Sequence, residues 1–493
     1  MSQNVDIMIL GSGFGGSLLA MVLRKLGLQV ALIERGSHPR FAVGESSTPT
    51  ADSVLRDLCQ RYDLPQLEPL TRYGSWRRLC PQIQCGLKRG FSYFAHQPGN
   101  DFQTDSGHSN ELLVAASQDD ASGDTHWYRA DVDAFLVQEA IKLGVHYFDQ
   151  TKIEQLRHLS PGWQLSCQRT QQTFSVSSSF LIDATGPAQF LPQWLGLSDD
   201  TLTLHTNSWS VFGHFDHVPL WSAILNASNI DQNDYPFHCD HAAQHHILDE
   251  GWMWQLRFAN GRTSAGLMFD GPCETSTDTT DIWKGTLQRY PSLSRQFTQP
   301  QVVTVQPLQR TRRLQRKLST ASGVDWALMP HTYGFIDPLH STGIAQTLCG
   351  IERLAVGFSN GVEKCQLSDY SVELNREFEL IDRLVHGCYL ARNQFPLLVD
   401  YTMLYFAAAT TFERMRQENV PSAFLCSHDA RFRGLVAEAH DRLIQTVQSG
   451  SADETAAFSA WLKENITPYN HVGLMDSSAN NMYRRTGPQK RET

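Results

Sequence analysis

The most constraining feature of this sequence is a pattern within residues 5–36. VDIMIL (5–10) is a short, continuously apolar run, which is typical of a strand buried on both faces of a parallel sheet. A glycine-rich turn, GSGFGG, precedes an apolar run at helical spacing, SLLAMVLRKLG, and a second strand-like run, QVALIERG, covers 29–36. The pattern predicts a strand–helix–strand unit, and therefore an α/β protein.

The glycines of this turn have the spacing GxGxxG, at Gly11, Gly13 and Gly16, and Glu34 ends the second strand. The first glycine allows a tight turn, the second lets the backbone approach a pyrophosphate, and the third lets the helix pack on the strand. The acid accepts a hydrogen bond from a ribose hydroxyl. With both strands and the helix in place, the motif predicts a Rossmann-like dinucleotide-binding domain, but by itself it does not distinguish NAD from FAD.

Three later segments favour FAD. LIDATG (181–186) puts Asp183 and a glycine after an apolar strand, where a second backbone segment must approach the dinucleotide. Arg129 and Asp133 open a predicted amphipathic helix. Asp337 precedes another predicted helix, whose N-terminal amides would face the flavin pyrimidine, where reduced flavin carries negative charge.

The rest of the chain divides by pattern. We expect an FAD-binding domain over 1–200, completed by 300–370, and a β-rich region over 201–299 that contacts substrate and shields the flavin. A helical, aromatic-rich C-terminal subdomain is expected over 371–475, and the polar segment 476–493 is expected to be a flexible tail.

Composition narrows the functional class. The 493 residues carry a net charge of −10 and no basic block, which argues against a nucleic-acid partner. Ten cysteines include no CxxC pair, a usage typical of reduced thiols in a cytoplasm. Neither an export signal nor a membrane-spanning run is recognisable, so we expect a cytoplasmic protein without a membrane partner.

Taken together, ERxxxPRFxxGESS, LIDATG and GFIDPL resemble the FAD-dependent monooxygenase-like fold. Within that fold, PRFAVGESSTPT (39–50), CGLKRGF (85–91), GWMW (251–254) and FIDPLHSTGI (335–344) are similar to the flavin-dependent halogenases, with the phenol-acting branch closest. The resemblance covers about residues 5–355 and continues more loosely into the helical C-terminal part.

This resemblance implies a chemistry. FADH2 from a separate NAD(P)H flavin reductase would react with O2, and chloride or bromide beside Ser341, Thr342 and Gly343 would be oxidised to hypohalous acid. The acid would pass through an internal tunnel to a lysine beside the aromatic substrate, and Lys88 is the residue that matches. The residues expected to contact the cofactor are Gly11, Gly13, Phe14, Gly15, Gly16, Glu34, Arg35, Arg40, Ser47, Arg129, Asp183, Gly186, Asp337, Gly343 and Ile344.

Lys88 stands in a strand-like run in which it shares one face with Gly90 and Ser92, while Leu87 and Phe91 share the other. A lysine that points inward beside small residues leaves room for a small oxidant, and burial disfavours its charged form. The alternative is a surface lysine on an edge strand that extends its ammonium into water.

His340 precedes Ser-Thr-Gly, where the tryptophan-acting relatives carry a glutamate that stabilises the cation formed on attack. A phenol needs less of this help, because its own oxygen donates into the ring. His340 therefore argues against free tryptophan and for a phenolic ring, either as a catalytic base near neutral pH or as a polar loop residue.

Trp252 and Trp254 lie two positions apart, which predicts a strand with both indoles on one face. The family form of this stretch is WxWxIP, and its indoles would keep substrate away from the oxidised flavin. Here Leu256 and Arg257 replace Ile and Pro. Arg257 would point away from the indoles, so Arg257→Pro is expected to change little. Because the family proline is absent here, an aromatic hydroxylase remains an alternative.

A histidine cluster and an aromatic cluster are interpreted as structural features. His238, His241, His245 and His246 include an i,i+4 pair, but we interpret them as polar helix positions and expect no metal site. In the C-terminal helices, Tyr401, Tyr405, Phe406 and Phe412 are expected to pack in the core, with some lining the substrate cavity.

The leading hypothesis is an FADH2-dependent halogenase of secondary metabolism that acts on a free, electron-rich and phenolic aromatic. The alternatives are an aromatic hydroxylase of the same fold, a halogenase of a carrier-protein-bound aromatic, and an FAD-binding module without turnover. A homodimer is left open.

Overall fold

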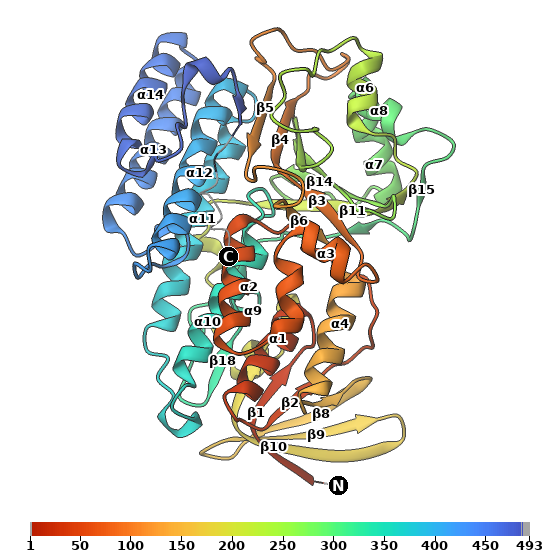
Figure 1. The fold of residues 1–493 in the computed structure, drawn as a ribbon, viewed down its shortest axis with the longest axis vertical. Helices are drawn as coiled ribbons and strands as arrows, with labels where there is room; N and C mark the ends of the chain where they lie inside the picture. The colour runs from red at the N-terminus through yellow and green to blue at the C-terminus, as the bar shows by residue number, and fades with distance from the viewer. Residues whose placement is uncertain (1, 485, 487–493) are drawn as a thin grey trace.

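The computed structural model describes residues 2–484 and 486. Three parts are visible in Figure 1: an α/β part that holds the N-terminus at the bottom, a second sheet with its own helices at the upper right, and a helical C-terminal part at the upper left.

The α/β part is built on a mixed sheet with the strand order β7-β2-β1-β10-β9-β8, in which β18 also pairs with β10. Its strands are β1 (Ser2–Leu10), β2 (Val30–Ile33), β7 (His146–Phe148), β8 (Thr151–His158), β9 (Trp163–Arg169), β10 (Gln172–Asp183) and β18 (Trp326–Leu328). The β7-β2-β1-β10 pairs are parallel, and β10-β9-β8 run antiparallel. The carboxyl ends of β1, β2 and β10 therefore meet at one edge, where dinucleotides bind in such sheets.

Helices α1 (Phe14–Lys25), α4 (Arg129–Lys142) and α10 (Thr342–Gly357) pack beside this sheet, with α1 against both others. Residues 18–23 of α1 are all buried, since the helix is covered on more than one side. Both α1 and α10 start next to the carboxyl edge of the sheet, so the predicted strand–helix–strand unit and the Rossmann-like α/β class are confirmed.

The second sheet has the order β15-β11-β14-β13-β12-β4-β5-β20, and β16 pairs with β11. Its strands are β4 (Gly90–Ala95), β5 (Glu111–Ala115), β11 (Ser208–Asp216), β12 (Ala243–Leu248), β13 (Gly251–Arg257), β14 (Thr263–Asp270), β15 (Val303–Thr304), β16 (Gln309–Arg310) and β20 (Met482–Tyr483). The sheet therefore extends beyond the region 201–299 expected from sequence, because β4 and β5 come from inside the segment assigned to the cofactor domain.

One face of the second sheet is covered by α6 (Trp221–Ala227), α7 (Thr279–Gln288) and α8 (Pro291–Phe297). The side chains between them form a separate hydrophobic cluster that includes Trp221, Trp283 and Phe297. The main cluster covers the α/β and helical parts, and on the opposite face of the second sheet it includes Phe91, Tyr93 and Trp252. Alternate residues along the strands of this sheet thus pack into two different hydrophobic clusters.

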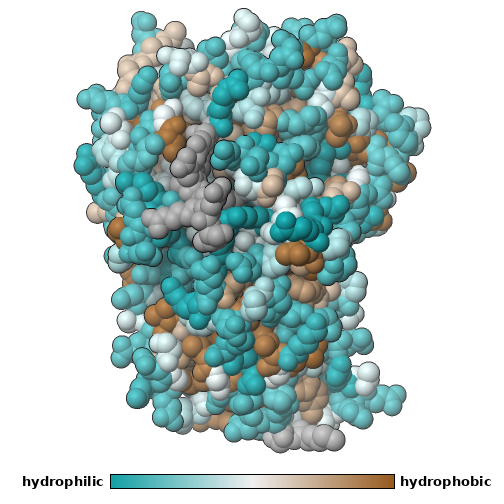
Figure 2. Space-filling model, in the orientation of Figure 1, coloured by the Kyte–Doolittle hydropathy of each residue, from teal (hydrophilic) through white to brown (hydrophobic). Residues whose placement is uncertain are grey.

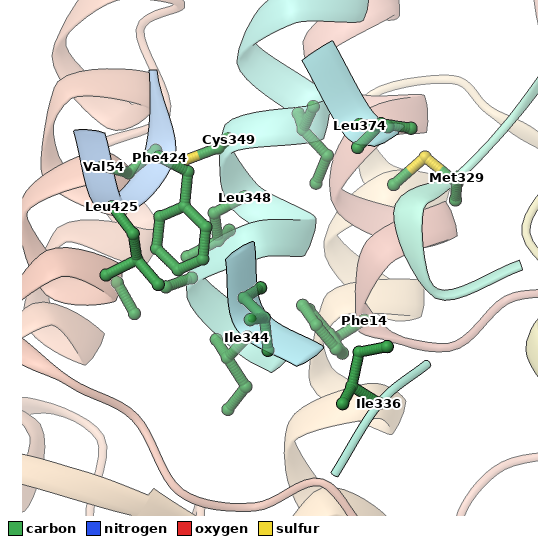
Figure 3. Close-up of a cluster of buried hydrophobic side chains, with 14 of the residues drawn as sticks. Phe14, Val54, Met329, Ile336, Ile344, Leu348, Cys349, Leu374, Phe424 and Leu425 are labelled. Carbon is green, nitrogen blue, oxygen red and sulfur yellow. The ribbon is translucent and has the colours of Figure 1, made fainter. Parts of the chain in front are cut away.

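The C-terminal part consists of α11 (Tyr370–Ala391), α12 (Phe395–Gln417), α13 (Ala430–Ser449) and α14 (Ala452–Asn465). It joins the α/β part through the main hydrophobic cluster. Figure 3 shows Leu348 and Cys349 of α10 facing Phe424, Leu425 and Val54. The helical part is thereby fixed against α10, the helix that begins at the candidate site.

Shorter elements complete the fold: α2 (Pro49–Arg61), α3 (Tyr73–Leu79), β3 (Cys85–Lys88), β6 (Asp124–Trp127), α5 (Phe190–Leu195), β17 (Arg316–Lys317), α9 (Pro330–Tyr333) and β19 (Gly334–Phe335). β3 pairs with β6 in a two-stranded ribbon of its own. Within the described residues, the chain has no helix with the length and apolarity needed to cross a bilayer. The face drawn in Figure 2 is mainly hydrophilic, with hydrophobic residues scattered across it.

The prediction that residues 476–493 form a flexible tail is wrong for the part of this segment that the structure describes. β20 pairs in parallel with β5, through Met482 opposite Leu113, and both side chains of β20 are buried. The hydrophobic Met-Tyr pair inside an otherwise polar segment supplies the apolar surface that docks it. Residue 485 and residues 487–493 lie outside the described part.

Candidate active site

The glycine-rich turn has the backbone that its sequence predicts. Gly11 has φ +96°, and a Cβ there would lie 2.6 Å from the carbonyl oxygen of Ala184. A Cβ on Gly16 would lie 2.1 Å from the carbonyl oxygen of Gly11. Only glycine fits either position, because the turn, the start of α1 and the end of β10 are in direct backbone contact.

Gly13 is different, because a Cβ there would make only ordinary van der Waals contacts, all with charged side chains. Its nearest neighbours would be Nη2 of Arg129 at 3.7 Å, and Nη2 of Arg40 and a carboxylate oxygen of Asp133 at 3.8 Å. Nε of Arg40 is buried without a hydrogen-bond partner among the described residues. Two guanidinium groups therefore face a cradle at the N-terminus of the 12-residue helix α1, an arrangement that fits the pyrophosphate of FAD.

Glu34 ends β2 beside this cradle. Its Oε2 accepts hydrogen bonds from the backbone N–H of Ser12 at 3.0 Å and its hydroxyl at 3.1 Å, and Oε1 accepts from the N–H of Gly36 at 2.9 Å. Burial raises its pKa, but the hydrogen bonds from Gly36 and Ser12 and the charge of Arg40 outweigh that effect and lower it. The ionised carboxylate fits the predicted ribose acceptor. Arg35 beside it is exposed.

Arg129 anchors the loop that contains the GESS motif. Its guanidinium forms a bidentate ion pair with Asp133, at 2.8 and 2.9 Å, and donates to the carbonyl oxygens of Val43 at 2.9 Å and Gly44 at 3.1 Å. The same group lies 4.7 Å from the centre of the Phe14 ring. The predicted cofactor residues Arg129 and Phe14 thus hold the GESS loop against α1.

A cavity of about 200 Å³ opens beside this loop. Its lining includes Arg40, Phe41, Tyr128, His214 and Arg262, so it lies between the cofactor cradle and the second sheet. The cavity provides space next to the pyrophosphate cradle on the side of the second sheet.

Two predicted cofactor residues, Asp183 and Asp337, have carboxylates that the protein itself satisfies. Asp183 accepts from the N–H groups of Thr185 and Leu191, both at 2.7 Å. Asp337 accepts from the N–H of Leu339 at 3.0 Å and from two hydroxyl groups, those of Ser208 and Tyr389, at 2.9 Å. Burial raises the pKa of Asp337 to about 7, although these hydrogen bonds oppose the rise. Both acids therefore shape loops at the cofactor edge. The sequence alone does not distinguish this role from direct contact with the cofactor.

Helix α10 begins at the residues predicted to hold halide. Ser341 precedes it in a left-handed conformation, with φ 52° and ψ 33°. Ile344 is buried in the first turn, whereas a Cβ added to Gly343 would have no atom within 4 Å. The N-terminus of this 16-residue helix thus faces open space with partial positive charge, which suits an anion or the electron-rich edge of a reduced flavin.

Lys88 is fully buried, so the alternative of a surface lysine is wrong. Its ammonium donates to the carbonyl oxygen of Ser47 at 2.6 Å and lies 4.1 Å from the centre of the Phe91 ring. Burial lowers its pKa to about 7, and Asp124 and Asp52 oppose that fall. Lys88 is therefore close to its titration point at neutral pH.

Phe91 contacts Lys88 although the alternation of a continuous strand predicted it on the other face. The reason is that β3 ends at Lys88 and β4 begins at Gly90. Between them the N–H of Arg89 donates to the carbonyl oxygen of His241 at 2.6 Å, so the alternation restarts there.

The GESS loop connects the start of α10 to Lys88. The hydroxyl of Ser341 donates to the hydroxyl of Ser46 at 3.1 Å, and Lys88 donates to the carbonyl oxygen of the adjacent residue, Ser47. Ser47 was predicted to contact the cofactor, and Ser46 was not singled out at all. Only the match to the GESS motif could have pointed to it, because a serine in a loop carries no periodic signal.

Aromatic side chains surround the far side of Lys88. The ring centre of Phe91 lies 6.0 Å from that of Tyr405 and 5.5 Å from that of Phe406, both on α12. His340 stacks on Tyr405, with ring centres 4.4 Å apart and an interplanar angle of 7°. Of the four aromatics singled out in the sequence, Tyr405 and Phe406 therefore reach the site, whereas Phe412 packs on Phe424 and Tyr401 donates to the carbonyl oxygen of Arg383.

Two polar atoms in this cluster are buried without a hydrogen-bond partner among the described residues, the hydroxyl of Tyr93 and Nδ1 of His340. Burial lowers the pKa of His340 to about 3, so its imidazole is neutral at physiological pH. A group this weakly basic is a poor proton acceptor, and the structure therefore disfavours the predicted role of His340 as a base near neutral pH. Its free nitrogen is suited to a hydrogen bond with a substrate.

The paired tryptophans lie on β13 of the second sheet, on the face that contributes to the main hydrophobic cluster. Trp252 donates its indole N–H to the hydroxyl of Tyr389 at 3.0 Å, and Tyr389 donates to Asp337. Trp254 lies beside Phe212, which stacks on Phe41 of the GESS loop. The two indoles are 6.1 Å apart and inclined at 54°. Each indole is thus tied to a different cofactor-side loop, as a partition would require.

Arg257 lies on the opposite face of β13, as predicted, but it is not a solvated substitute for proline. Its side chain pairs with the buried Asp240 at 3.0 Å and donates to the carbonyl oxygens of Val218 and Pro219. Burial raises the pKa of Asp240, while Arg257 and the N–H groups of Trp221 and Ser222 lower it below its usual value. We therefore expect Arg257→Pro to destabilise the fold, since it would leave Asp240 buried without its cation. The expectation that it changes halogenation little stays a prediction.

The predicted helix of polar histidines is also wrong. His245 and His246 lie on strand β12 and point to opposite faces. Nε2 of His245 lies 2.9 Å from the carbonyl oxygen of Leu339, in the loop that leads to His340, whereas His246 contacts His96 at 3.0 Å in the other core. An i,i+4 spacing brings side chains together only on a helix, and on a strand it separates them.

Comparison with known proteins gives consistent results. The family model described as FAD dependent oxidoreductase matches residues 6–312. The monodechloroaminopyrrolnitrin halogenase PrnC of Pseudomonas fluorescens is 29% identical over 448 residues, covering 87% of this chain and 75% of the relative. The tetracycline 7-halogenase of Kitasatospora aureofaciens is 26% identical over 495 residues, covering 92% and 85%.

Among solved structures, the halogenase PltM in complex with phloroglucinol and FAD superposes with a TM-score of 0.85 at 23% identity, covering 97% of this chain and 99% of that one. At this identity the likeness establishes a shared fold. The predicted fold, with its helical C-terminal region, and the predicted resemblance to flavin-dependent halogenases are confirmed.

Proposed function

This chain belongs to the FAD dependent oxidoreductase family, and we propose that it is a halogenase that transfers chlorine or bromine to a free phenolic substrate at Lys88. The observation that carries the proposal is the continuous link from Ser341, at the start of α10, through Ser46 and Ser47 to the buried Lys88. An oxidised halogen formed at the helix end would meet this lysine without passing through bulk solvent.

Reduced FAD, when bound, supplies two electrons that, with two from the halide, reduce O2 to water and hypohalous acid. The remaining steps belong to the chain. The amides at the start of α10 hold the halide, and the indoles of Trp252 and Trp254 keep the aromatic substrate on the far side of a partition. Without that partition the substrate would itself take the oxygen atom and become hydroxylated.

Lys88 serves the transfer in either protonation state, because its pKa lies near 7. As an ammonium it donates a hydrogen bond to hypohalous acid, and as an amine it takes the halogen and releases water. The halogen then replaces a ring hydrogen of the substrate. The proton from the ring leaves with the hydroxide of the hypohalous acid in the first route and returns to the lysine nitrogen in the second.

The groups around Lys88 favour a phenolic substrate. The hydroxyl of Tyr93 and Nδ1 of His340 are buried and unpaired, and each would gain a hydrogen bond from a ring hydroxyl. Phe91 and Tyr405, in edge-to-face contact with each other, add aromatic surface suited to an aromatic ring. The phloroglucinol held by PltM is a phenol, whereas other relatives are named for carrier-protein-bound pyrroles. We therefore propose a free phenol, with the reduced flavin delivered by a separate reductase.

The test supplies a flavin reductase, NADH, FAD, O2 and bromide to the enzyme, with phloroglucinol and a carrier-bound aromatic offered in parallel. Mass spectrometry reads the products. A bromine isotope doublet on the free phenol is the expected result. Addition of oxygen without bromine would indicate the hydroxylase, and a doublet confined to the carrier would replace the free substrate with a bound one.

A matched pair of variants isolates the lysine. Lys88→Ala should abolish bromination while leaving NADH consumption and hydrogen peroxide release intact, whereas Lys142→Ala, an exposed lysine on α4, should behave as wild type. Bromination that survives in Lys88→Ala would show that the transfer does not use this lysine.

A further inference from the structure

Three histidines from distant parts of the chain meet on the helical side of the molecule. His205 precedes β11, His386 lies on α11 and His440 on α13, the two neighbouring helices of the C-terminal part. One ring nitrogen of each lies within 4.8 Å of the others. Nδ1 of His386 and Nε2 of His440 are 2.8 Å apart. None of the three belongs to the site described above.

This spacing matches a transition-metal site. Zinc binds imidazole nitrogens at about 2.0–2.1 Å in a tetrahedron, which puts ligand nitrogens roughly 3.3 Å from one another. The observed separations, 2.8 Å for His386 and His440 and no more than 4.8 Å for any pair, are compatible with this value. His205 is exposed, whereas His440 is buried. The exposed side leaves an entry path and a fourth position for water.

The charges around the cluster also suit a cation. Burial lowers the pKa of His440 to about 4, and the other two histidines add to this effect. Burial likewise lowers the pKa of His386, against the opposing charges of Asp382 and Asp270. The neutral imidazole is the form of histidine that binds metal ions.

Carboxylates also lie beside this cluster. Asp441 lies 3.9 Å from Nδ1 of His440, on the opposite side of the ring from the shared nitrogen. Asp382 accepts the backbone N–H groups of His205 at 2.7 Å and Thr206 at 2.9 Å, which fixes the segment that carries the exposed histidine. Arg383 is the nearby cation that opposes this arrangement. Carboxylates beside ligating histidines are typical of metal sites.

We propose that His205, His386 and His440 bind one divalent transition-metal ion of the zinc class, with water as the fourth ligand. The ion would replace the hydrogen bond between His386 and His440 and tie α11, α13 and the segment before β11 together. Cys388 and Tyr389 follow His386 on α11, and they contact His340 and Trp252 respectively. The site would thus set the position of the helix behind the active site without contacting the reacting groups.

The experiment uses the full-length protein without an affinity tag, stripped with a chelator and dialysed. Zinc uptake is measured by elemental analysis, and cobalt titration is followed by visible absorption, which reports tetrahedral coordination. Wild type should take up one equivalent. His205→Ala should weaken zinc binding at least about tenfold, since loss of an orienting partner alone costs about 10–100-fold in metal affinity. His146→Ala, an exposed histidine on β7, is the matched control and should bind as wild type.

Because His205 is exposed, its removal does not threaten folding, and circular dichroism and FAD binding should be unchanged. No zinc uptake by wild type, or a zinc affinity of His205→Ala equal to that of wild type, would overturn the proposal. Metal content is read without turnover, so this outcome is independent of whether the enzyme halogenates.

Discussion

Replacing Lys88 by methionine should make this enzyme more stable and inactive. The pKa of the buried ammonium falls from 10.5 to about 7, and at about 1.4 kcal/mol for each pH unit of this fall, protonated Lys88 costs the fold about 5 kcal/mol. Methionine fills a similar volume without charge. It leaves the carbonyl of Ser47 without its donor, which costs about 1–3 kcal/mol. We therefore expect a net gain of about 3 kcal/mol at pH 7.

The stability difference between wild type and Lys88→Met should also depend on pH in a defined direction. Between about pH 7 and 10 the folded chain binds fewer protons at Lys88 than the unfolded chain, so wild-type stability rises with pH, by about 1.4 kcal/mol per unit from this group. Lys88→Met lacks this contribution. Its advantage should be largest at and below pH 7 and should disappear towards pH 10.

Urea unfolding of both proteins from pH 6 to 10, read by tryptophan fluorescence, measures this difference, with Lys142→Met as the control at an exposed lysine. The bromination assay is run on the same samples. A variant that is less stable than wild type at pH 7, or whose advantage does not change with pH, would refute the reasoning that burial lowers the pKa of Lys88.

Three further changes follow from the packing. Arg257→Leu should cost about 3–5 kcal/mol in urea unfolding, because it strands the buried Asp240; equal stability would mean that Asp240 is protonated or solvated. Gly16→Ala should abolish FAD retention on gel filtration, because its Cβ would lie 2.1 Å from a backbone oxygen, whereas Gly434→Ala on α13 meets no atom within 4 Å and should retain FAD. Trp252→Ala should convert part of the brominated product into hydroxylated product by mass spectrometry, and an unchanged product ratio would argue against a shield.

The cofactor half of the fold could be predicted because its signals are local. A buried parallel strand, a glycine-rich turn and an amphipathic helix occur within 36 residues, and Gly11 and Gly16 are required by backbone contacts within that unit and with β10. The burial of Lys88 followed from the family match, since a single lysine in an apolar run is equally consistent with an exposed edge.

What the sequence could not supply are contacts between distant segments. Arg257 and Asp240 form a buried pair across two loops and a strand, and nothing near either residue marks it. Strand β12 was mistaken for a helix because both of its faces are buried, so His245 and His246 break no visible alternation. Ser46 acquires its hydrogen-bond partner only in the folded chain, because Ser341, at the start of α10, lies nearly 300 residues later in the sequence.

The pairing of β20 with β5 has a consequence for how the chain is made. β5 leaves the ribosome early, and its partner Met482 leaves it long afterwards. Until then, the N–H and C=O groups of β5 at this edge remain open, and an open strand edge can pair with another chain. The risk of aggregation is therefore greatest during synthesis, and a ribosome that stalls before β20 would release a chain whose second sheet is folded but unsealed.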